Sequence, residues 1–453
     1  FVQQALIKLG CFEGVFILVT RKEKRNREKE ANYFFEFLKI QKHFFKDLMN
    51  NLKKVADHRH QSYITYGPEV LLFTMMLKNM TGLKSMRNMS ESFNKEECIK
   101  NVGKVLGLDS LEELPHYDTI NDFLSGLDVN ELEKIRTYMI KELLKKRSLE
   151  SYRIEGKYWG VIIDGTGLHT FHEKHCKHCL RRAYTNKETG ETNVLYMHHV
   201  LEAKLVVGDM VFSIASEFIE NESENVSKQD CELKAFDRLA KKIKKIFKRL
   251  PICILGDSLY ACETVFNLCR AHKWKYICRF KEGRIKSIST EFKAIKELEQ
   301  SKDQNSLVWV NDIAYKDRTV NLMEATMKTE DGKSKEYVFI TDIKITKKNV
   351  ERLIAAGRSR WKIENQGFNE QKNNRYNIEH ANSQNYTAMK NHYLLVQITD
   401  IIRQLFEKGS SILKALKKTA KEKSSNLLES FRTRILTDED FTHLSKPIQV
   451  RFT

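Results

Sequence analysis

The spacing of apolar residues divides the chain into a helical region, a region of strands and a second helical region. Between residues 31 and 151, apolar residues recur every three or four positions, as in Leu132, Ile135 and Met139. This period is typical of helices that bury one face. We therefore expect residues 31–151 to form an all-α region of several helices.

Beyond this region, short continuous apolar runs predict buried strands. Such runs occupy Tyr158–Asp164 and Ile252–Gly256. Two further strands, 196–207 and 210–219, are separated by Gly208-Asp209, a pair typical of hairpin turns. Helical segments alternate with the later strands, and this order favours an α/β sheet.

The patterns beyond residue 285 predict the remaining divisions of the chain. Short alternating strands over 286–346 indicate an inserted β subdomain, and the helical period returns over 347–407, with a helix expected from Val350 to Lys372. The α/β core therefore has a first part at 152–285 and a C-terminal helical part at 347–407. The flanking segments are a basic N-terminal extension, 1–30, and a Lys-rich tail, 408–453.

Composition narrows the class of protein. The chain has 453 residues, of which 41% are hydrophobic, so a large core can form. No apolar run approaches the ~20 residues needed to cross a bilayer, and no membrane association is expected. The formal charge of +18 favours a polyanionic partner, because basic residues that neutralise phosphates release counterions. An odd number of scattered cysteines, nine, indicates reduced thiols and a cytoplasmic protein.

Three carboxylates stand where an α/β sheet places catalytic residues. Asp164 and Asp257 each follow an apolar strand, and sites in open α/β sheets collect at the carboxyl ends of strands. Glu364, on a later predicted helix, can add a third oxygen ligand for divalent cations. Each residue alone is more often a cap or a surface residue. Together they predict a site for two ions about 3.5–4 Å apart, suited to phosphodiester chemistry.

The segments around these carboxylates resemble the three acidic motifs of a known family. Asp164-Gly-Thr-Gly, Gly256-Asp-Ser-Leu-Tyr260 and Arg360-Trp-Lys-Ile-Glu364 are similar to motifs of bacterial insertion-sequence transposases, in the insertion-sequence-four group of DDE enzymes. The resemblance covers roughly residues 114–405. It implies a ribonuclease-H-like core in which Asp164, Asp257 and Glu364 are catalytic and bind Mg²⁺ or Mn²⁺, as two ions.

The resemblance also implies partners and a place of action. In this group a helical DNA-binding region precedes the core, which would be residues 31–151 here. The DNA partners would be double-stranded transposon ends and target DNA, cleaved and joined without a small-molecule cofactor. A homodimer on paired ends, acting in the bacterial cytoplasm at the nucleoid, is a further expectation.

Basic residues near Glu364 are candidates for contact with DNA phosphates. Arg360 precedes Glu364 by one helical turn, so it could instead be a plain partner of that carboxylate within the helix. Trp361 could stack on an unpaired base, although a helical Trp is more often part of a core. The five candidates for DNA binding are Arg358, Arg360, Lys362, Lys372 and Arg375.

The resemblance is incomplete at two positions. The group's signature is Tyr, two residues, Arg, three residues, Glu, six residues, and Lys or Arg. Gly357 stands in place of the Tyr, and Gln371 stands in place of the basic residue. These departures indicate a divergent branch or weakened activity.

Cys176-Lys-His-Cys179 has the spacing of half a zinc site. No second pair of this kind lies nearby, and His198 or His199 could join only after folding. The sequence therefore favours reduced thiols in a loop over structural zinc.

Two other functions remain open. Asp164-Gly-Thr-Gly167 resembles the phosphate loop of actin-like sugar or acetate kinases, but their second Asp-Gly turn and Gly-rich adenosine motif are missing. A DNA-binding protein with a degenerate nuclease fold is the other alternative. The three retained carboxylates favour the enzyme, and an activity assay separates the two.

Overall fold

A computed structural model describes residues 31–221, 228–299, 307–328, 332, 334–450 and 452. The predicted basic extension, 1–30, lies outside the described residues. The chain forms two compact units, one made of residues up to 120 with 402–453, and the other of residues 121–401. These units differ from the expected divisions, because the C-terminal segment groups with the N-terminal helices.

The first unit is helical, as the apolar spacing predicts. Its C-terminal segment, expected as a Lys-rich tail, contributes to the core: Leu427 and Phe431 are fully buried. The rings of Phe431 and Phe34 lie 4.9 Å apart between centroids. Lysines can cover the outer face of a helix while such apolar positions, four residues apart, face inward. The elements are α2 (Tyr33–Phe44), α3 (Leu48–Lys53), η1 (Gln61–Tyr63), α4 (Pro68–Thr81), α5 (Met86–Phe93), α6 (Glu96–Leu106), α14 (Ser411–Leu416), α15 (Ala420–Thr433) and α16 (Asp438–Leu444).

The second unit combines a mixed sheet with helices. Two helices, α7 (Tyr117–Gly126) and α13 (Tyr386–Gly409), contain residues of both units. The other elements are α8 (Val129–Leu144), η2 (Arg147–Tyr152), β1 (Trp159–Phe171), β2 (Leu180–Thr185), β3 (Thr192–Val207), β4 (Met210–Ile219), α9 (Glu232–Ile246), β5 (Ile252–Gly256), α10 (Glu263–His272), β6 (Lys275–Arg279), α11 (Lys286–Glu299), β7 (Leu307–Tyr315), β8 (Arg318–Lys328), β9 (Ser334–Thr341), α12 (Val350–Arg358) and η3 (Ile363–Arg375).

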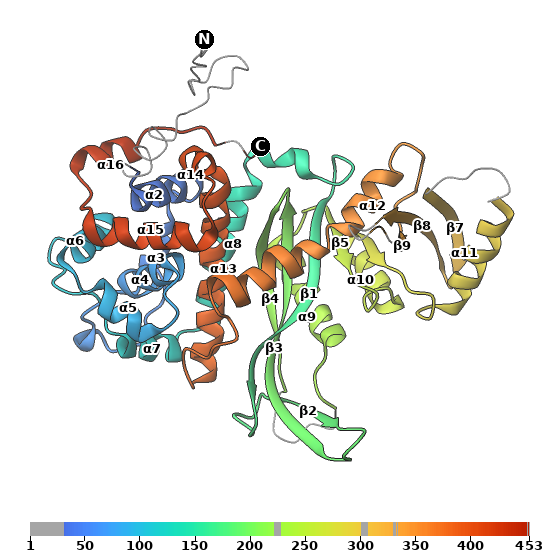
Figure 1. Ribbon diagram of the computed structural model, residues 1–453, viewed down its shortest axis with the longest axis horizontal. Coiled ribbons are helices and arrows are strands. Elements are labelled where there is room, and N and C mark those ends of the chain that lie inside the picture. The colour runs from blue at the N-terminus through green and yellow to red at the C-terminus, as the bar shows by residue number, and fades with distance from the viewer. Residues whose placement is uncertain are drawn as a thin grey trace, which may run out of the picture. The chain divides into compact units, whose positions relative to one another are not determined.

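Five strands form the core of this sheet in the order β4-β3-β1-β5-β6. The pairs β4–β3 and β3–β1 are antiparallel, whereas β1–β5 and β5–β6 are parallel. This is the ribonuclease-H-like arrangement that the family resemblance implies, and it confirms the predicted α/β class. The hairpin at Gly208 and the strand β5 are also confirmed. The strand β2, which the apolar pattern did not predict, pairs with the first part of the long strand β3 (Figure 1).

The strands expected as an inserted β subdomain extend the same sheet. β9 pairs with β6 in antiparallel fashion, and β8 and β7 continue outward. Met323 and Phe339 lie in one hydrophobic core with Ile277 of β6. Strand periodicity could not show this continuity, because it does not say which edge a strand joins.

The prediction of one helix from Val350 to Lys372 is wrong, because the structure has two helices of different types there. α12 ends at Arg358, and after a short turn η3 is a π-helix, in which the Tyr376 N–H bonds the Gln371 carbonyl five residues earlier. η3 packs on β1 and β4, while α12 packs on β5, β6 and β8 (Figure 1). Apolar spacing alone does not separate the two helix types, and π-helices are often found at functional sites. Among the described residues, no helix is long and apolar enough to cross a membrane.

Candidate active site

The two predicted aspartates emerge from neighbouring parallel strands. Ile162 of β1 pairs with Leu255 of β5, and Asp164 and Asp257 each follow two residues later. The same register therefore brings both carboxylates to one end of the sheet. Side chains at this end are available to a ligand, because the carboxyl ends of parallel strands open onto the loops.

Local hydrogen bonds hold both aspartates. The Asp164 carboxylate accepts a bond from the Gly165 N–H at 3.0 Å. The Asp257 carboxylate accepts one from the Leu259 N–H at 2.8 Å, which fixes the turn after β5. In each residue the other carboxylate oxygen stays free of this backbone bond, so a metal ligand atom remains available.

Arg360 connects the predicted glutamate to the first aspartate. One nitrogen of its guanidinium lies 2.7 Å from Glu364 Oε1 and 3.6 Å from Asp164 Oδ2. The Arg360 side chain is only 12% exposed. Glu364 and Asp164 come from different elements, and both therefore lie near the Arg360 guanidinium.

The pKa of Asp164 is affected by burial and by several nearby charged residues. Burial is the largest cause that raises its pKa, to about 7, and Arg360 opposes this rise. The carboxylates of Glu364, Glu232 and Asp257 raise the pKa further. Four like charges gathered in a partly desolvated site favour the binding of a cation that neutralises them.

A fourth acid, Glu232 at the start of α9, was not predicted from the sequence. A Cβ atom at position 165 would lie 2.7 Å from Glu232 Oε1, so glycine at this position lets Glu232 approach β1. The Tyr260 hydroxyl donates to Glu232 at 3.3 Å. Burial raises the pKa of Glu232, and Asp257 adds to the rise, while the Tyr260 hydrogen bond lowers it. Gly165 and Tyr260 both belong to the acidic motifs, so those motifs carried a signal for a fourth acid.

The sequence also gave no prediction for Lys204, a buried lysine that lies against η3. Lys204 of β3 is fully buried, and its Nζ lies 5.2 Å from the centre of the Phe368 ring. Among the described residues, this nitrogen has no hydrogen-bond partner. Burial lowers the pKa of Lys204, and the Glu202 and Asp400 carboxylates oppose that shift. A charged residue inside the apolar run of β3 was the available signal.

Arg358 is the predicted DNA-binding residue that lies open to solvent. Its guanidinium lies 5.3 Å from the centre of the Tyr337 ring. Trp361 is nearby and 44% exposed, so it is a surface residue and not part of a core. Both belong to a cavity of about 270 Å³ with basic and aromatic walls. The lining residues are Arg279, Lys281, Lys335, Tyr337, Phe339, Gly357, Arg358 and Trp361.

The other three predicted DNA-binding residues have acidic partners within the chain. Lys362 pairs with Asp209 at 3.1 Å, and Lys372 pairs with Glu379 at 2.8 Å. Arg375 lies 3.1 Å from Glu370 and 3.4 Å from Asp400, with its side chain 10% exposed. In the absence of DNA, these three cations are therefore neutralised internally.

Packing explains both departures from the family signature. A Cβ atom at Gly357 would lie 2.7 Å from the Phe339 ring, so a larger side chain has no room there. Gln371 is fully buried and donates to Gln397 at 3.1 Å and to Asp400 at 2.9 Å. A charged residue at that position would be buried rather than directed to DNA.

The chain is similar to a known protein family. The profile of the family described as "Transposase DDE domain" matches residues 155–399. The chain belongs to this family. The DDE domain thus spans β1 to α13 and contains all four clustered acids. Family membership removes the actin-like kinase as an alternative.

The DDE domain can also be compared with solved structures and curated proteins. One similar structure is titled "Cryo-EM structure of piggyBac transposase synaptic complex with hairpin DNA (SNHP)". It is 11% identical, with a TM-score of 0.41, and the match covers 92% of this chain and 83% of that one. No curated protein matches this chain.

Proposed function

We propose that this protein is a DNA transposase that cleaves transposon ends and joins them to target DNA, with Asp164, Asp257 and Glu364 as its catalytic carboxylates. The observation that carries the proposal is the shared guanidinium. Arg360 contacts Glu364 and approaches Asp164, while the parallel register places Asp257 beside Asp164. Carboxylates from two strands and a helix thereby converge within the DDE domain.

The donor set fits Mg²⁺ or Mn²⁺. Every candidate ligand atom is a carboxylate oxygen, the type that hard divalent cations prefer. Asp164, Asp257 and Glu364 would hold the ions, with Glu232 close enough to add charge. Bound as a pair, such ions supply activation of the attacking oxygen and stabilisation of the leaving oxygen.

The chain's own groups prepare this site. Arg360 offsets the repulsion among the carboxylates before cations arrive. The first step would hydrolyse one phosphodiester bond at the transposon end and leave a 3′-hydroxyl. That hydroxyl would then attack a phosphorus atom of target DNA, forming one phosphodiester bond as another breaks.

DNA is proposed to run along the basic cavity beside Glu364. Arg358 and Trp361 lie within a few residues of Arg360, and Arg279, Lys281 and Lys335 add positive charge. Arginine can hold a phosphate through two parallel hydrogen bonds, and an exposed tryptophan can stack on an unpaired base. Lys362, Lys372 and Arg375 remain predicted contacts that would have to exchange their internal partners for phosphates. Binding of both ends by a homodimer at the bacterial nucleoid belongs to the same proposal.

The test is cleavage of labelled transposon-end DNA by the full chain in Mg²⁺. Genomic sequence flanking the gene would supply the candidate ends. The proposal expects nicking that needs Mg²⁺ or Mn²⁺ and that ceases in Asp164→Asn, Asp257→Asn and Glu364→Gln. Specific binding of the ends by the wild-type chain without cleavage in either metal would support the degenerate-nuclease alternative.

A further inference from the structure

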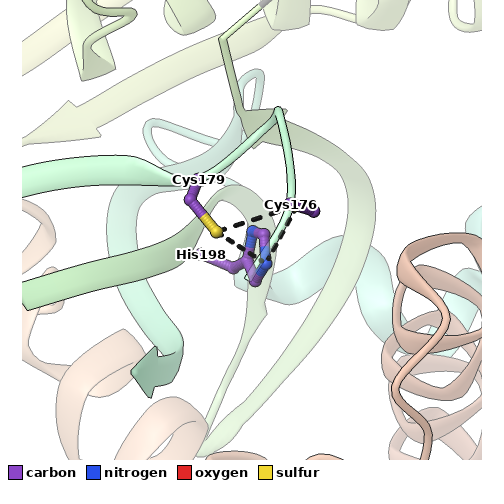
Figure 2. A group of neighbouring side chains, drawn as sticks. All are labelled: Cys176, Cys179 and His198. Carbon is purple, nitrogen blue, oxygen red and sulfur yellow. Dashed lines mark hydrogen bonds between the residues drawn. The ribbon is translucent and has the colours of Figure 1, made fainter. Parts of the chain in front are cut away.

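A second group of potential ligands comes from the connection that follows β1, the strand of Asp164, and from β3, which pairs with β1. Cys176 and Cys179, from the β1–β2 connection, meet His198 of β3. The three side chains point toward one another (Figure 2). Both cysteines are free thiols. The sequence offered only half a site, and the fold supplies the third ligand by bringing β3 under the Cys-x-x-Cys turn.

The spacing of the three atoms matches the edges of a coordination tetrahedron. The two Sγ atoms are 3.7 Å apart, and His198 Nε2 lies 3.7 Å from Cys176 Sγ and 3.6 Å from Cys179 Sγ. With zinc bonds of about 2.3 Å to sulfur and about 2.0–2.1 Å to nitrogen, tetrahedral angles give edges of about 3.8 Å and about 3.6 Å. A single ion at the centre would therefore reach all three atoms without rearranging the chain.

The side chains around the proposed ligands are partly buried and leave one side open to solvent. His198 is 2% exposed and Cys179 is buried, whereas Cys176 is partly exposed and gives an ion a path of entry. Among the described residues, His198 Nδ1 has no hydrogen-bond partner. With its proton on Nδ1, His198 presents the lone pair of Nε2 to the thiols, as a neutral imidazole ligand requires.

Other histidines hold the same turn in place without facing its centre. His178 Nδ1 lies 3.0 Å from the Asn221 carbonyl oxygen, and His175 Nε2 lies 2.9 Å from that of Gln384. The ring of Tyr386 packs on both His178 and His198 at 4.7 Å between centroids. These contacts fix the loop from several directions, so the thiols and the imidazole are preorganised.

We propose that Cys176, Cys179 and His198 bind one Zn²⁺ ion, with the fourth position left to water or an exchangeable ligand. The site is distinct from the carboxylate cluster, because thiolate and imidazole ligands select zinc over magnesium. The ion fastens the β1–β2 connection to β3 and so fixes the base of the β2–β3 hairpin, which carries the exposed Arg182. Its role is structural and does not depend on the proposed transposase reaction.

The test measures metal content in the purified full chain. Elemental analysis after exposure to ZnCl₂ and desalting should find about one zinc per wild-type chain. The double variant Cys176→Ser/Cys179→Ser should lose at least nine-tenths of it, and His198→Gln should bind more weakly. Cys231→Ser is the matched control, because it changes an exposed cysteine outside the cluster and should keep its zinc.

Two readouts on the wild-type chain remain decisive if the variants fold poorly. Zinc should protect Cys176 and Cys179 from alkylation, detected by peptide mass spectrometry, while Cys231 stays reactive. Co²⁺ in place of zinc should give a sulfur-to-cobalt charge-transfer absorption. A wild-type chain that binds neither ion, or a double variant with undiminished zinc, would overturn the proposal.

Discussion

The carboxylate cluster and the thiol–imidazole cluster belong to the same mixed sheet yet differ in every ligand atom. Asp164 lies on β1, whereas Cys176 and Cys179 follow β1 and His198 lies on β3, which pairs with β1. The carboxylate cluster offers only oxygen ligands, whose negative charges repel one another. The thiol–imidazole cluster offers two sulfurs and a nitrogen at tetrahedral spacing. Side-chain chemistry, and not position in the sheet, therefore sets which cation each site selects.

The two clusters also differ in what happens without metal. Arg360 already occupies the space between Asp164 and Glu364, so the acidic site is stabilised by a cation of the chain itself. The described residues place no such cation between the thiols and His198. We therefore expect removal of magnesium to stop catalysis and removal of zinc to weaken the fold.

The largest expected effect is a loss of DNA cleavage when the carboxylate cluster, and not the thiol–imidazole cluster, is changed. Asp164→Asn, Asp257→Asn and Glu364→Gln should each lower Mg²⁺-dependent cleavage by ~10³-fold or more, because each removes a ligand worth several kcal/mol. Initial rates on labelled end DNA measure the loss. Zinc content should stay at the wild-type level, and a parallel loss of zinc would mean that the two clusters are not independent.

The next largest effect is a loss of stability when zinc is removed from the thiol–imidazole cluster. Withdrawing zinc should lower the free energy of unfolding by about 3 kcal/mol, since a ligand at 100 times its dissociation constant contributes about that amount. Urea titrations of the zinc-loaded and zinc-free chain give the difference. The same comparison in Cys176→Ser/Cys179→Ser should show no response to zinc.

Arg360→Lys should have an intermediate effect, lowering cleavage by about 10- to 100-fold. Lysine keeps the charge but cannot reach both carboxylates or hold a phosphate through two bonds. Arg360→Ala should also reduce the salt dependence of end binding by a slope of about one contact. Near-normal turnover by Arg360→Ala would reduce this residue to a partner within its own helix.

The smallest effect concerns stability and pH without Mg²⁺. Asp164 has a folded pKa of about 7, above the unfolded value near ~3.9, so its protonated form stabilises the fold at low pH. That contribution is lost as pH rises through about 7. Asp164→Asn should therefore be more stable than wild type by on the order of 1 kcal/mol at pH 8, and by little at pH 4. An equal difference at both values would remove titration of Asp164 as the cause.

The amino-acid sequence by itself determined the α/β class, most of the strands and the positions of three acids. Apolar runs ending in aspartate need only local information, because a buried strand and the polar residue at its end are adjacent in the chain. Tertiary structure decided what these elements meet. It added Glu232 to the acids, turned the helix after Ser359 into a π-helix, joined β9 to β6 and buried Phe431 of the expected tail. It also completed the Cys176 and Cys179 pair with His198, about twenty residues away, since strand pairing, unlike residue type, sets which distant side chains become neighbours.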